Sequence, residues 1–402
     1  MAQVNVIGLG YIGLPTAGLL AQAGHQVLGV DVQAEVVDKI NAGLPHFEEK
    51  GLKNLVEESV GSGLLKASQS PQKADVHLII VPTPFIEEDK SADMSYVHSA
   101  CENLAPVLEE GNLVVLESTS ALGATRQDVM AVIEKTRPEL KGKVHYAFCP
   151  ERAIPGNTLY ELIHNDRVVG GVNEASTEKA VAFYSTFIKG AILPADDKVA
   201  EMVKLSENAF RDVNIAYANE LSIVCDELGI NVWDVIRLAN HHPRVNILQP
   251  GPGVGGHCIA IDPWFIVAAS KAGNAKLMKQ AREINDGKPH WVVGKVVEAV
   301  AKTNKENPTV GLLGLAFKPN VDDLRESPSL KVASLLKSAL KANIIACEPY
   351  VEELEGFTLV SQEEILEKAD VLVMLTDHDA FKTITLENLK GKQLIDTRGS
   401  IN

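Results

Sequence analysis

The first 195 residues alternate short apolar runs with stretches of helical periodicity. The apolar runs, which read as buried parallel strands, are Val4–Ile7, Val27–Val30, Val76–Val81, Leu113–Leu116 and Val144–Phe148. Residues 168–193 add a further strand–helix–strand unit. Strands that alternate with helices in this way predict a doubly wound, Rossmann-like sheet.

From residue 196 the pattern becomes helical. Residues 196–228 predict one long helix that ends before Gly229, because glycine commonly terminates helices. Further helices are expected at 231–240, 262–272 and 276–303. The middle of the chain is therefore predicted to be all-helical.

After the polar stretch KTNKENP, alternation of strands and helices resumes. The expected strands are Val310–Leu315, Ile344–Cys347, Val371–Leu375 and Gln393–Ile395, with helices at 328–341 and 361–368. The predicted fold class is α/β, with two Rossmann-like doubly wound domains joined by an all-helical middle segment that contains a long central helix. The domains expected are residues 1–195, 196–303 and 304–402.

Composition narrows the class of protein. The chain has 402 residues, of which 46% are hydrophobic, and a formal net charge of −15, which argues against nucleic acid or an anionic membrane as a partner. It contains no apolar run of 18 residues, and its first residues lack the basic region of a signal peptide. The five cysteines are scattered, so we expect reduced thiols in the cytoplasm, with neither a disulfide framework nor a metal site.

A glycine-rich turn follows the first predicted strand. It reads Gly8-Leu9-Gly10-Tyr11-Ile12-Gly13 and opens a helical run, which is the context that a dinucleotide-binding turn requires. Asp31 ends the second strand, where a carboxylate binds the ribose hydroxyls and repels a 2′-phosphate. The pattern predicts NAD binding by Gly8, Gly10, Tyr11, Ile12, Gly13 and Asp31. A turn that only packs a helix on a strand is the alternative.

Two threonines follow other strands of the first sheet. Thr83 lies in VPTP and Thr119 in ESTS, each directly after a buried strand. Ligands of open α/β sheets bind beyond the carboxyl ends of the strands, so both threonines are candidates for cofactor binding. The alternative is a hydroxyl that caps a helix or a turn.

The segment GPGVGGHCIAID, residues 251–262, places Cys258 behind four glycines in six residues. Such a loop lets the backbone approach a ligand closely and predicts a nucleophilic thiol, whereas the alternative is a buried cysteine that packs as a small apolar residue. His257 is adjacent, but neighbouring side chains need not face each other. His241 and His242 lack the i, i+4 spacing of metal ligands, which favours a substrate-contacting loop or plain surface.

Polar and basic residues supply the remaining candidates. Lys204, Asn208 and Arg211 share one face of the long helix, which is either a substrate-facing stripe or a solvated face with an ion pair from Glu207 to Arg211. Glu151 and Arg152 follow a strand in CPER. Lys318 in GLAFKP and Arg325 in DDLRESP suit phosphate, unless they pair with nearby acidic residues.

The motifs GLGYIGLP, VPTP, EST, CPER, KLSENAFRDVNIAYANE, HPRVNILQPGPGVGGHCIAIDPW and GLAFKPNVDDLRESP together resemble the UDP-glucose/GDP-mannose dehydrogenase family, in the family's order across residues 8–329. The block from HPRVNI to DPW is most similar to the branch that oxidises UDP-N-acetyl-D-mannosamine. Ala153 departs from this branch, which more often has valine there, although a backbone contact survives the change.

The resemblance implies an N-terminal NAD domain, a helical middle that forms a homodimer, and a C-terminal domain that binds the UDP-sugar substrate. It implies that two NAD+ oxidise the sugar C6 alcohol to a carboxylate through a thioester, for surface polysaccharide synthesis. The catalytic residues implied are Cys258, Lys204, Glu151, Asn208, Asp262 and Thr119. The substrate-binding residues implied are Arg152, Ala153, Lys204, Asn208, Arg211, His242, Arg244, Gly253, Phe317, Lys318 and Arg325.

Other enzyme and protein classes stay open at this point. UDP-N-acetylglucosamine or UDP-glucose is an alternative substrate. A two-electron hydroxyacid dehydrogenase needs neither Cys258 nor a second Rossmann-like unit. A thiol hydrolase leaves the glycine turn and Asp31 unexplained, and an NAD-binding sensor does not need the thiol.

Overall fold

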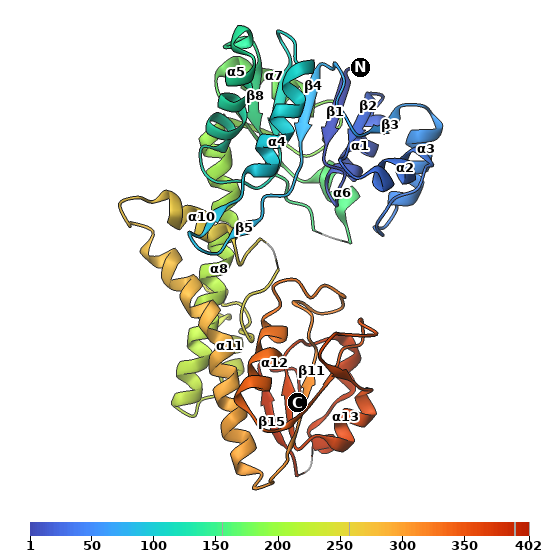
Figure 1. The fold of residues 1–402 in the computed structure, drawn as a ribbon. Helices are drawn as coiled ribbons and strands as arrows, with labels where there is room; N and C mark the ends of the chain where they lie inside the picture. Colours follow the sequence, from blue (N-terminus) through green and yellow to red (C-terminus); the bar gives the residue numbers. More distant parts are fainter. Residues whose placement is uncertain (155, 257, 390, 402) are drawn as a thin grey trace. The chain divides into compact units, whose positions relative to one another are not determined.

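The computed structural model describes residues 1–154, 156–256, 258–389 and 391–401. The chain divides into two compact units, Met1–Ser206 and Glu207–Asn402. Both units are α/β (Figure 1).

The first unit is built on an eight-stranded sheet in the order β10-β9-β8-β7-β4-β1-β2-β3. The strands are β1 (Gln3–Ile7), β2 (Gln26–Val30), β3 (Leu65–Ser68), β4 (Val76–Ile79), β7 (Leu113–Leu116), β8 (His145–Phe148), β9 (Arg167–Gly171) and β10 (Ile192–Asp196). All neighbouring pairs are parallel except β8 and β9. The sequence pattern missed β3, an edge strand in which only Leu65 is fully buried, and the short hairpin of β5 (Phe85–Ile86) and β6 (Ser91–Ala92).

Helices cover both faces of this sheet (Figure 1). They are α1 (Gly13–Gln22), α2 (Ala34–Asn41), α3 (Leu52–Gly61), α4 (Ser95–Leu104), α5 (Ala131–Thr136), α6 (Thr158–His164) and α7 (Glu174–Tyr184). One apolar core includes Leu14, Ile40 and Phe183 from α1, α2 and α7, and the other includes Leu104 and Ile133 from α4 and α5. The strands are apolar throughout because both of their faces are buried.

The second unit contains a five-stranded parallel sheet in the order β13-β12-β11-β14-β15. Its strands are β11 (Thr309–Leu313), β12 (Asn343–Cys347), β13 (Thr358–Leu359), β14 (Val371–Met374) and β15 (Gln393–Asp396). Its helices are α9 (Val232–Ala239), α10 (Asp262–Ala269), α11 (Lys276–Lys302), α12 (Pro328–Ala339) and α13 (Gln362–Lys368). Helices α11 and α12 cover one face of the sheet and α13 the other, which confirms the predicted fold class.

Helix α8 (Asp197–Glu227) begins in the first unit and ends in the second, and confirms the predicted long helix. Its buried polar residues are Asp197, Glu201, Asn208, Asp212, Asn219 and Ser222. At 100° per residue, these six fall within an arc of roughly 80°. We call this face the polar stripe of α8.

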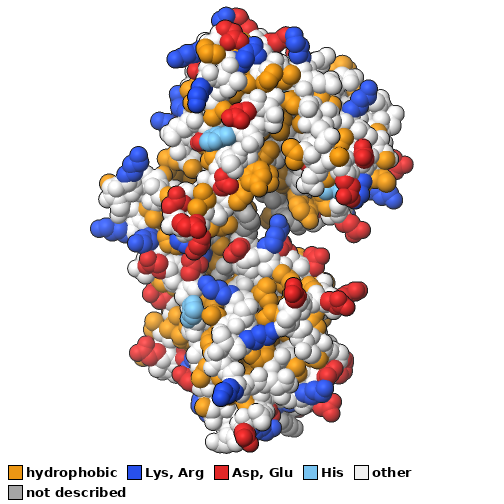
Figure 2. All heavy atoms as spheres, viewed as in Figure 1, with side chains coloured by type: hydrophobic (Ala, Val, Ile, Leu, Met, Phe, Trp, Pro, Cys, Tyr) orange, Lys and Arg blue, Asp and Glu red, His pale blue; other side chains and the backbone are white. Residues whose placement is uncertain are grey.

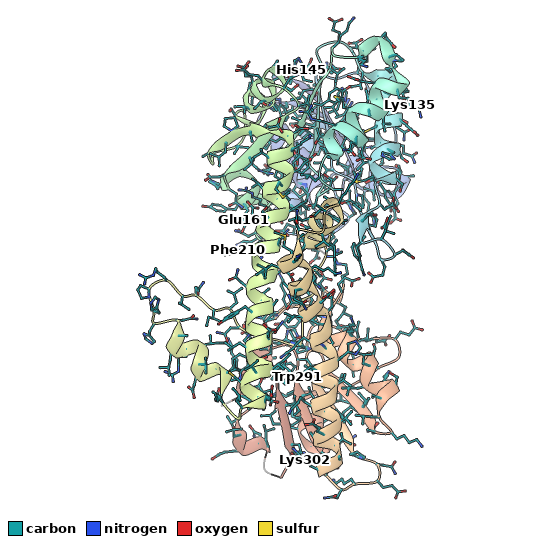
Figure 3. All side chains as sticks on the ribbon, turned by 90° about the vertical axis from the view of Figure 1, so that its left-hand side faces the viewer. Lys135, His145, Glu161, Phe210, Trp291 and Lys302 are labelled. Carbon is teal, nitrogen blue, oxygen red and sulfur yellow. The ribbon has the colours of Figure 1, made fainter. Side chains whose placement is uncertain are left out.

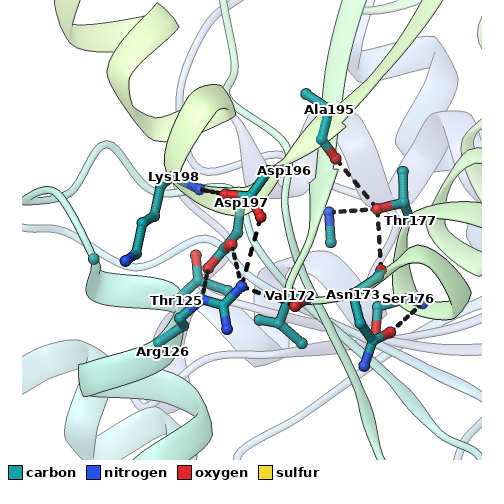
Figure 4. A network of polar contacts seen from close by, with 12 residues as sticks. Thr125, Arg126, Val172, Asn173, Ser176, Thr177, Ala195, Asp196, Asp197 and Lys198 are labelled. Atoms are coloured by element: carbon teal, nitrogen blue, oxygen red, sulfur yellow. Dashed lines mark hydrogen bonds and ion pairs between the residues drawn. The ribbon is translucent and has the colours of Figure 1, made fainter.

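The start of α8 is fixed by ion pairs and hydrogen bonds within the first unit (Figure 4). Arg126 makes two hydrogen bonds of 2.8 Å to the fully buried carboxylate of Asp197 and a third, also 2.8 Å, to the carbonyl oxygen of Val172. One turn later, the Glu201 carboxylate accepts the backbone N–H and the hydroxyl of Thr125 at 2.9 and 2.7 Å. These contacts determine the rotation of α8 about its axis, and therefore the direction of Lys204 one turn further on.

Charges on the molecular surface are mixed. The face shown in Figure 2 carries both basic and acidic side chains. Among the described residues, no helix is both long enough and apolar enough to cross a membrane.

Candidate active site

In the glycine turn between β1 and α1, packing of the fold excludes a side chain at two of the glycines but not at the third. A Cβ on Gly8 would lie 2.3 Å from the Ile80 oxygen, and one on Gly13 would lie 1.8 Å from the Gly8 oxygen. A Cβ on Gly10 would meet open space. Packing therefore explains Gly8 and Gly13, whereas Gly10 leaves room for a ligand beside the N-terminus of α1, where backbone N–H groups attract phosphate.

Asp31 lies beside this turn, directly after β2. Its carboxylate accepts the backbone N–H of Leu9 at 3.1 Å and that of Gln33 at 3.0 Å. The side chain is partly exposed, and the following Val32 is 80% exposed. The predicted ribose-binding carboxylate and the predicted phosphate-binding turn are thus neighbours.

Thr83 and Thr119 lie together at the carboxyl edge of the sheet. The Thr83 hydroxyl donates a hydrogen bond to the Thr119 carbonyl oxygen, and the Ser118 hydroxyl donates to the Val81 oxygen at 2.7 Å. Strands β1, β4 and β7 are neighbours, so the loops that follow them meet at one edge. This is the edge at which open α/β sheets bind their ligands.

Lys204 contacts the segment that carries Glu151. The Lys204 Nζ donates to the Glu151 carbonyl oxygen at 2.7 Å, while the Glu151 carboxylate accepts the backbone N–H of Ala153. Arg152 donates to the Asp166 carbonyl oxygen at 3.3 Å. Lys204 and the backbone of Glu151 are thus adjacent in the first unit.

A buried polar cluster packs against the segment that carries Glu151. The Tyr184 hydroxyl donates to the Glu117 carboxylate, and Arg167 donates to the Pro150 carbonyl oxygen at 3.3 Å. Burial raises the pKa of Glu117 and raises the pKa of the Cys149 thiol to about 12. Cys149 is therefore a protonated, inert thiol, because the thiolate is the reactive form.

Cys258 is exposed, whereas the other four cysteines are buried. It lies just before α10, where its carbonyl oxygen accepts the backbone N–H groups of Ile261 and Asp262. Asn208 donates to the buried Asp262 carboxylate at 2.6 Å, so two of the three predicted catalytic residues of this unit are in contact. His257 lies outside the described residues.

The glycines before Cys258 make close contacts with other parts of the second unit. A Cβ on Gly255 would lie 2.6 Å from Pro328 and 2.9 Å from Phe317, and a Cβ on Gly256 would lie 3.0 Å from the Phe317 ring. Gly253 has φ +150°, and a Cβ there would lie 2.9 Å from Pro328. Part of the glycine pattern therefore serves packing against the GLAFKP loop, of which Phe317 is a member.

The predicted basic residues occupy different environments. Arg211, His242 and Arg244 are exposed, and Lys318 is partly buried. Arg325 pairs with Asp323, with a shortest distance of 2.7 Å. Pairing with a nearby acidic residue was the alternative to phosphate binding for this arginine. Among the described residues, no group of three potential metal ligands occurs.

Arg398 is a basic residue that the sequence pattern did not single out. Its guanidinium donates to the Pro250 carbonyl oxygen at 3.3 Å and to Asp377 at 2.7 Å. A Cβ on Gly251 would lie 2.7 Å from the same guanidinium. The segment that follows β15 thus places a cation at the start of the glycine loop, and only the fold brings these distant residues together.

Comparison with known proteins identifies the family. Models of the UDP-glucose/GDP-mannose dehydrogenase family match the chain over residues 2–188 (NAD binding domain), 198–287 (central domain) and 311–402 (UDP binding domain). The chain belongs to this family. Membership confirms the predicted class, an oxidoreductase of nucleotide sugars, and the predicted NAD cofactor.

Several relatives are similar over nearly the whole chain. The UDP-N-acetyl-D-mannosamine dehydrogenase of Salmonella typhimurium is 50% identical over 414 residues, covering 98% of each chain. The NDP-N-acetyl-D-galactosaminuronic acid dehydrogenase of Ralstonia nicotianae is 47% identical over 408 residues, covering 98% of this chain and 95% of the relative. The structure of UDP-D-ManNAc dehydrogenase from Pyrococcus horikoshii superposes with a TM-score of 0.91 at 38% identity, covering 100% of this chain and 96% of that one.

The position of Asp31 leads to a test of cofactor choice. We expect kcat/KM for NAD+ to exceed that for NADP+ by about 100-fold or more, because the carboxylate would face the 2′-phosphate. Asp31→Asn should reduce this ratio at least about tenfold, whereas Asp38→Asn, on the exposed side of α2, should leave it unchanged. Equal use of both cofactors by the unmodified enzyme would contradict the assignment.

Proposed function

We propose that the protein oxidises the C6 alcohol of UDP-N-acetyl-D-mannosamine to the uronate with two NAD+, through a thioester on Cys258, for surface polysaccharide synthesis. The observation that carries this proposal is an exposed thiol on a glycine loop in a chain with an NAD-binding domain. A reactive thiol requires a reducing compartment, so a cytoplasmic location belongs to the proposal.

The first half of the proposed reaction converts the alcohol to an aldehyde. Bound NAD+ supplies the hydride acceptor, and the glycine turn with Asp31, Thr83 and Thr119 would hold it. Lys204 takes or stabilises the hydroxyl proton while the C6–H bond breaks. Its amine is already held at the carboxyl edge of the sheet by the Glu151 carbonyl oxygen.

The second half needs the thiol. Cys258 adds to the aldehyde carbon, which gives a thiohemiacetal, and loss of a hydride to a second NAD+ leaves the thioester. Glu151 activates the water that cleaves the thioester, while Lys204 and Asn208 stabilise the oxyanion. Asp262 orients Asn208 through their hydrogen bond. Water supplies the second oxygen of the carboxylate, and the thiol is released unchanged.

Substrate binding is assigned to the residues that the family resemblance implies. The residues that hold the sugar and the diphosphate are Arg152, Ala153, Arg211, His242, Arg244, Gly253, Phe317, Lys318 and Arg325. We add Arg398 to this set because its guanidinium lies at the start of the glycine loop. The name of the Salmonella relative supports the mannosamine substrate. The Ralstonia relative, at nearly equal identity, makes the corresponding galactosamine nucleotide the second candidate.

A substrate panel tests the proposal. UDP-ManNAc, UDP-GalNAc, UDP-GlcNAc, UDP-Glc and GDP-Man are each supplied with excess NAD+, and we expect two NADH per UDP-ManNAc consumed. Cys258→Ser should lose acid formation by at least about a thousandfold while NAD+ and UDP binding persist, because the hydroxyl is a poor nucleophile of similar volume. One NADH per sugar, or unchanged turnover of the serine variant, would contradict the thioester mechanism and favour a two-electron dehydrogenase.

Glu151→Gln tests the assignment of the hydrolytic base. The amide keeps the shape of the side chain but cannot accept the proton of the attacking water, so NADH should form in a burst and then stall. Mass spectrometry of the stalled enzyme should find a uronyl adduct on Cys258. The matched control is Glu178→Gln in α7, an exchange of the same kind at an exposed position outside the proposed chemistry. Steady turnover of the Glu151 variant without an adduct would assign hydrolysis to another group.

We further propose that the protein is a homodimer that buries the apolar face of α8. Val199, Phe210, Tyr217 and Val224 are 53%, 71%, 56% and 43% exposed. They fall within an arc of roughly 40° opposite the polar stripe. Figure 3 labels Phe210 on this helix. Fully burying an exposed apolar side chain contributes about 1.5–3 kcal/mol, and covering what remains exposed of these four contributes a part of that each, so a second copy of the same face supplies a favourable term.

Charge placed on this face should prevent dimerisation. We expect light scattering to find Tyr217→Glu monomeric, because burying an unpaired carboxylate in the interface is costly. The variant should stay folded, with a thermal unfolding midpoint close to that of a single folded protomer. Glu220→Gln, at an exposed position outside the apolar arc, should remain a dimer. A Tyr217→Glu variant that stays dimeric would place the interface elsewhere.

A further inference from the structure

The segment that carries Cys258 is bound to helix α8 at both of its ends. At the far end, Asn208 donates to Asp262 at 2.6 Å. At the near end, Asn219 accepts the backbone N–H of Gly251 at 2.9 Å. The two asparagines are eleven residues apart, about three helical turns, and therefore lie on the same face of α8. Two amide side chains of one rigid helix thus hold the two ends of residues 251–262.

Asn219 cannot turn its amide over, because its other end is also bound. Its Nδ2 donates to the Asn285 Oδ1 at 2.8 Å, and the Asn285 Nδ2 donates to the Asp212 carboxylate at 2.8 Å. A carboxylate only accepts, so the direction of every hydrogen bond from Asp212 to Gly251 is determined. Arg282 donates to Asp212 at 2.6 Å, and these side chains are almost fully buried.

The backbone of α8 at Asn219 is held as well. Lys288 on α11 is buried and donates to the Ser222 hydroxyl at 2.5 Å and to the Asn219 carbonyl oxygen at 3.4 Å. Its ammonium lies 3.9 Å from the centroid of the Trp291 ring, which Figure 3 labels on α11. Asn219 is therefore fixed at its side chain and at its backbone.

A glycine loop needs such external support. Gly251, Gly253, Gly255 and Gly256 have no side chains of their own and lose more conformational entropy on ordering than any other residues. An error of about 1 Å in the position of a reacting atom can reduce a rate about 100-fold. The loop therefore requires fixed points on a rigid element if its thiol is to reach the aldehyde reproducibly.

We infer that Asn219 is a positioning residue for the Cys258 thiol, which fixes the near end of residues 251–262 on α8 as Asn208 fixes the far end. The inference rests on the proposed function, because the benefit of a placed thiol lies in the second oxidation. Asn219 contacts neither reacting atom and acts through the Gly251 backbone.

Asn219→Ala tests the inference through the partition between the two oxidations. The first hydride transfer does not use the thiol, so it should fall less than acid formation, which should fall about 10- to 100-fold. The intermediate aldehyde should then be captured by added hydroxylamine, and KM for NAD+ should not change. Asn214→Ala is the matched control, since Asn214 lies on α8 and its amide donates to the Phe210 carbonyl oxygen. It should behave as the unmodified enzyme does.

Two measurements do not depend on turnover. The rate of Cys258 alkylation by iodoacetamide, assigned by mass spectrometry, should change at least about threefold in Asn219→Ala and not in Asn214→Ala. In the unmodified protein, the Gly251 N–H should exchange with deuterium at least about tenfold more slowly than an unprotected amide. This measurement applies even if Asn219→Ala does not fold.

The outcomes separate the inference from the proposed function. A folded Asn219→Ala enzyme with an unchanged aldehyde partition and alkylation rate, or rapid exchange at Gly251, would overturn the positioning role. An unmodified enzyme that oxidises no UDP-sugar would overturn the proposed function, whereas the alkylation and exchange measurements would still report on the placement of the loop.

Discussion

The structure depends on a helix that buries a stripe of polar side chains. Helix α8 buries apolar residues such as Leu205, as most helices do, but it also buries Asp197, Asp212 and Asn219. Buried charges are stable only when they are paired and hydrogen-bonded, and loss of one partner costs about 3–5 kcal/mol. The arginines that meet Asp197 and Asp212 are therefore a requirement of the fold.

The same buried polar stripe accounts for the position of the candidate catalytic residues on α8. A polar stripe with a determined partner at each turn gives α8 one rotation about its axis, which a set of interchangeable apolar contacts would not do. Lys204 and Asn208 lie within this stripe, so contacts that fix α8 for structural reasons also direct the two side chains. The buried polar contacts of α8 therefore both fix the helix and place Lys204 and Asn208.

The sequence predicted the strands, the long helix and the glycine turn because each depends on local pattern. It missed edge strand β3, which is too short of apolar residues to stand out, and the antiparallel placement of β9, which depends on tertiary pairing. Arg398 and Asn219 were missed for a different reason. Their partners, Pro250 and Gly251, are distant in sequence, and no pattern marks such contacts before the chain folds.

The two Rossmann-like units have matching turns but differ in the carboxylate beside them. Gly8 and Gly314 have φ +93° and +81°, and each turn is followed by a backbone N–H bonded to an acidic side chain at the end of the next strand. Burial alone would raise the pKa of Glu348, but hydrogen bonds from His378 and the backbone lower it.

Glu348 is buried and has four hydrogen bonds within the protein, three of them at Oε2, whereas Asp31 is partly exposed and accepts one hydrogen bond at each oxygen. A carboxylate has about four lone-pair sites, so a partly exposed one with two hydrogen bonds keeps capacity for ribose hydroxyls that the buried Glu348 does not offer. The same turn therefore leaves Asp31 available for the predicted ribose contact in the first unit, whereas in the second unit Glu348 holds the GLAFKP loop through Leu315 and Ala316.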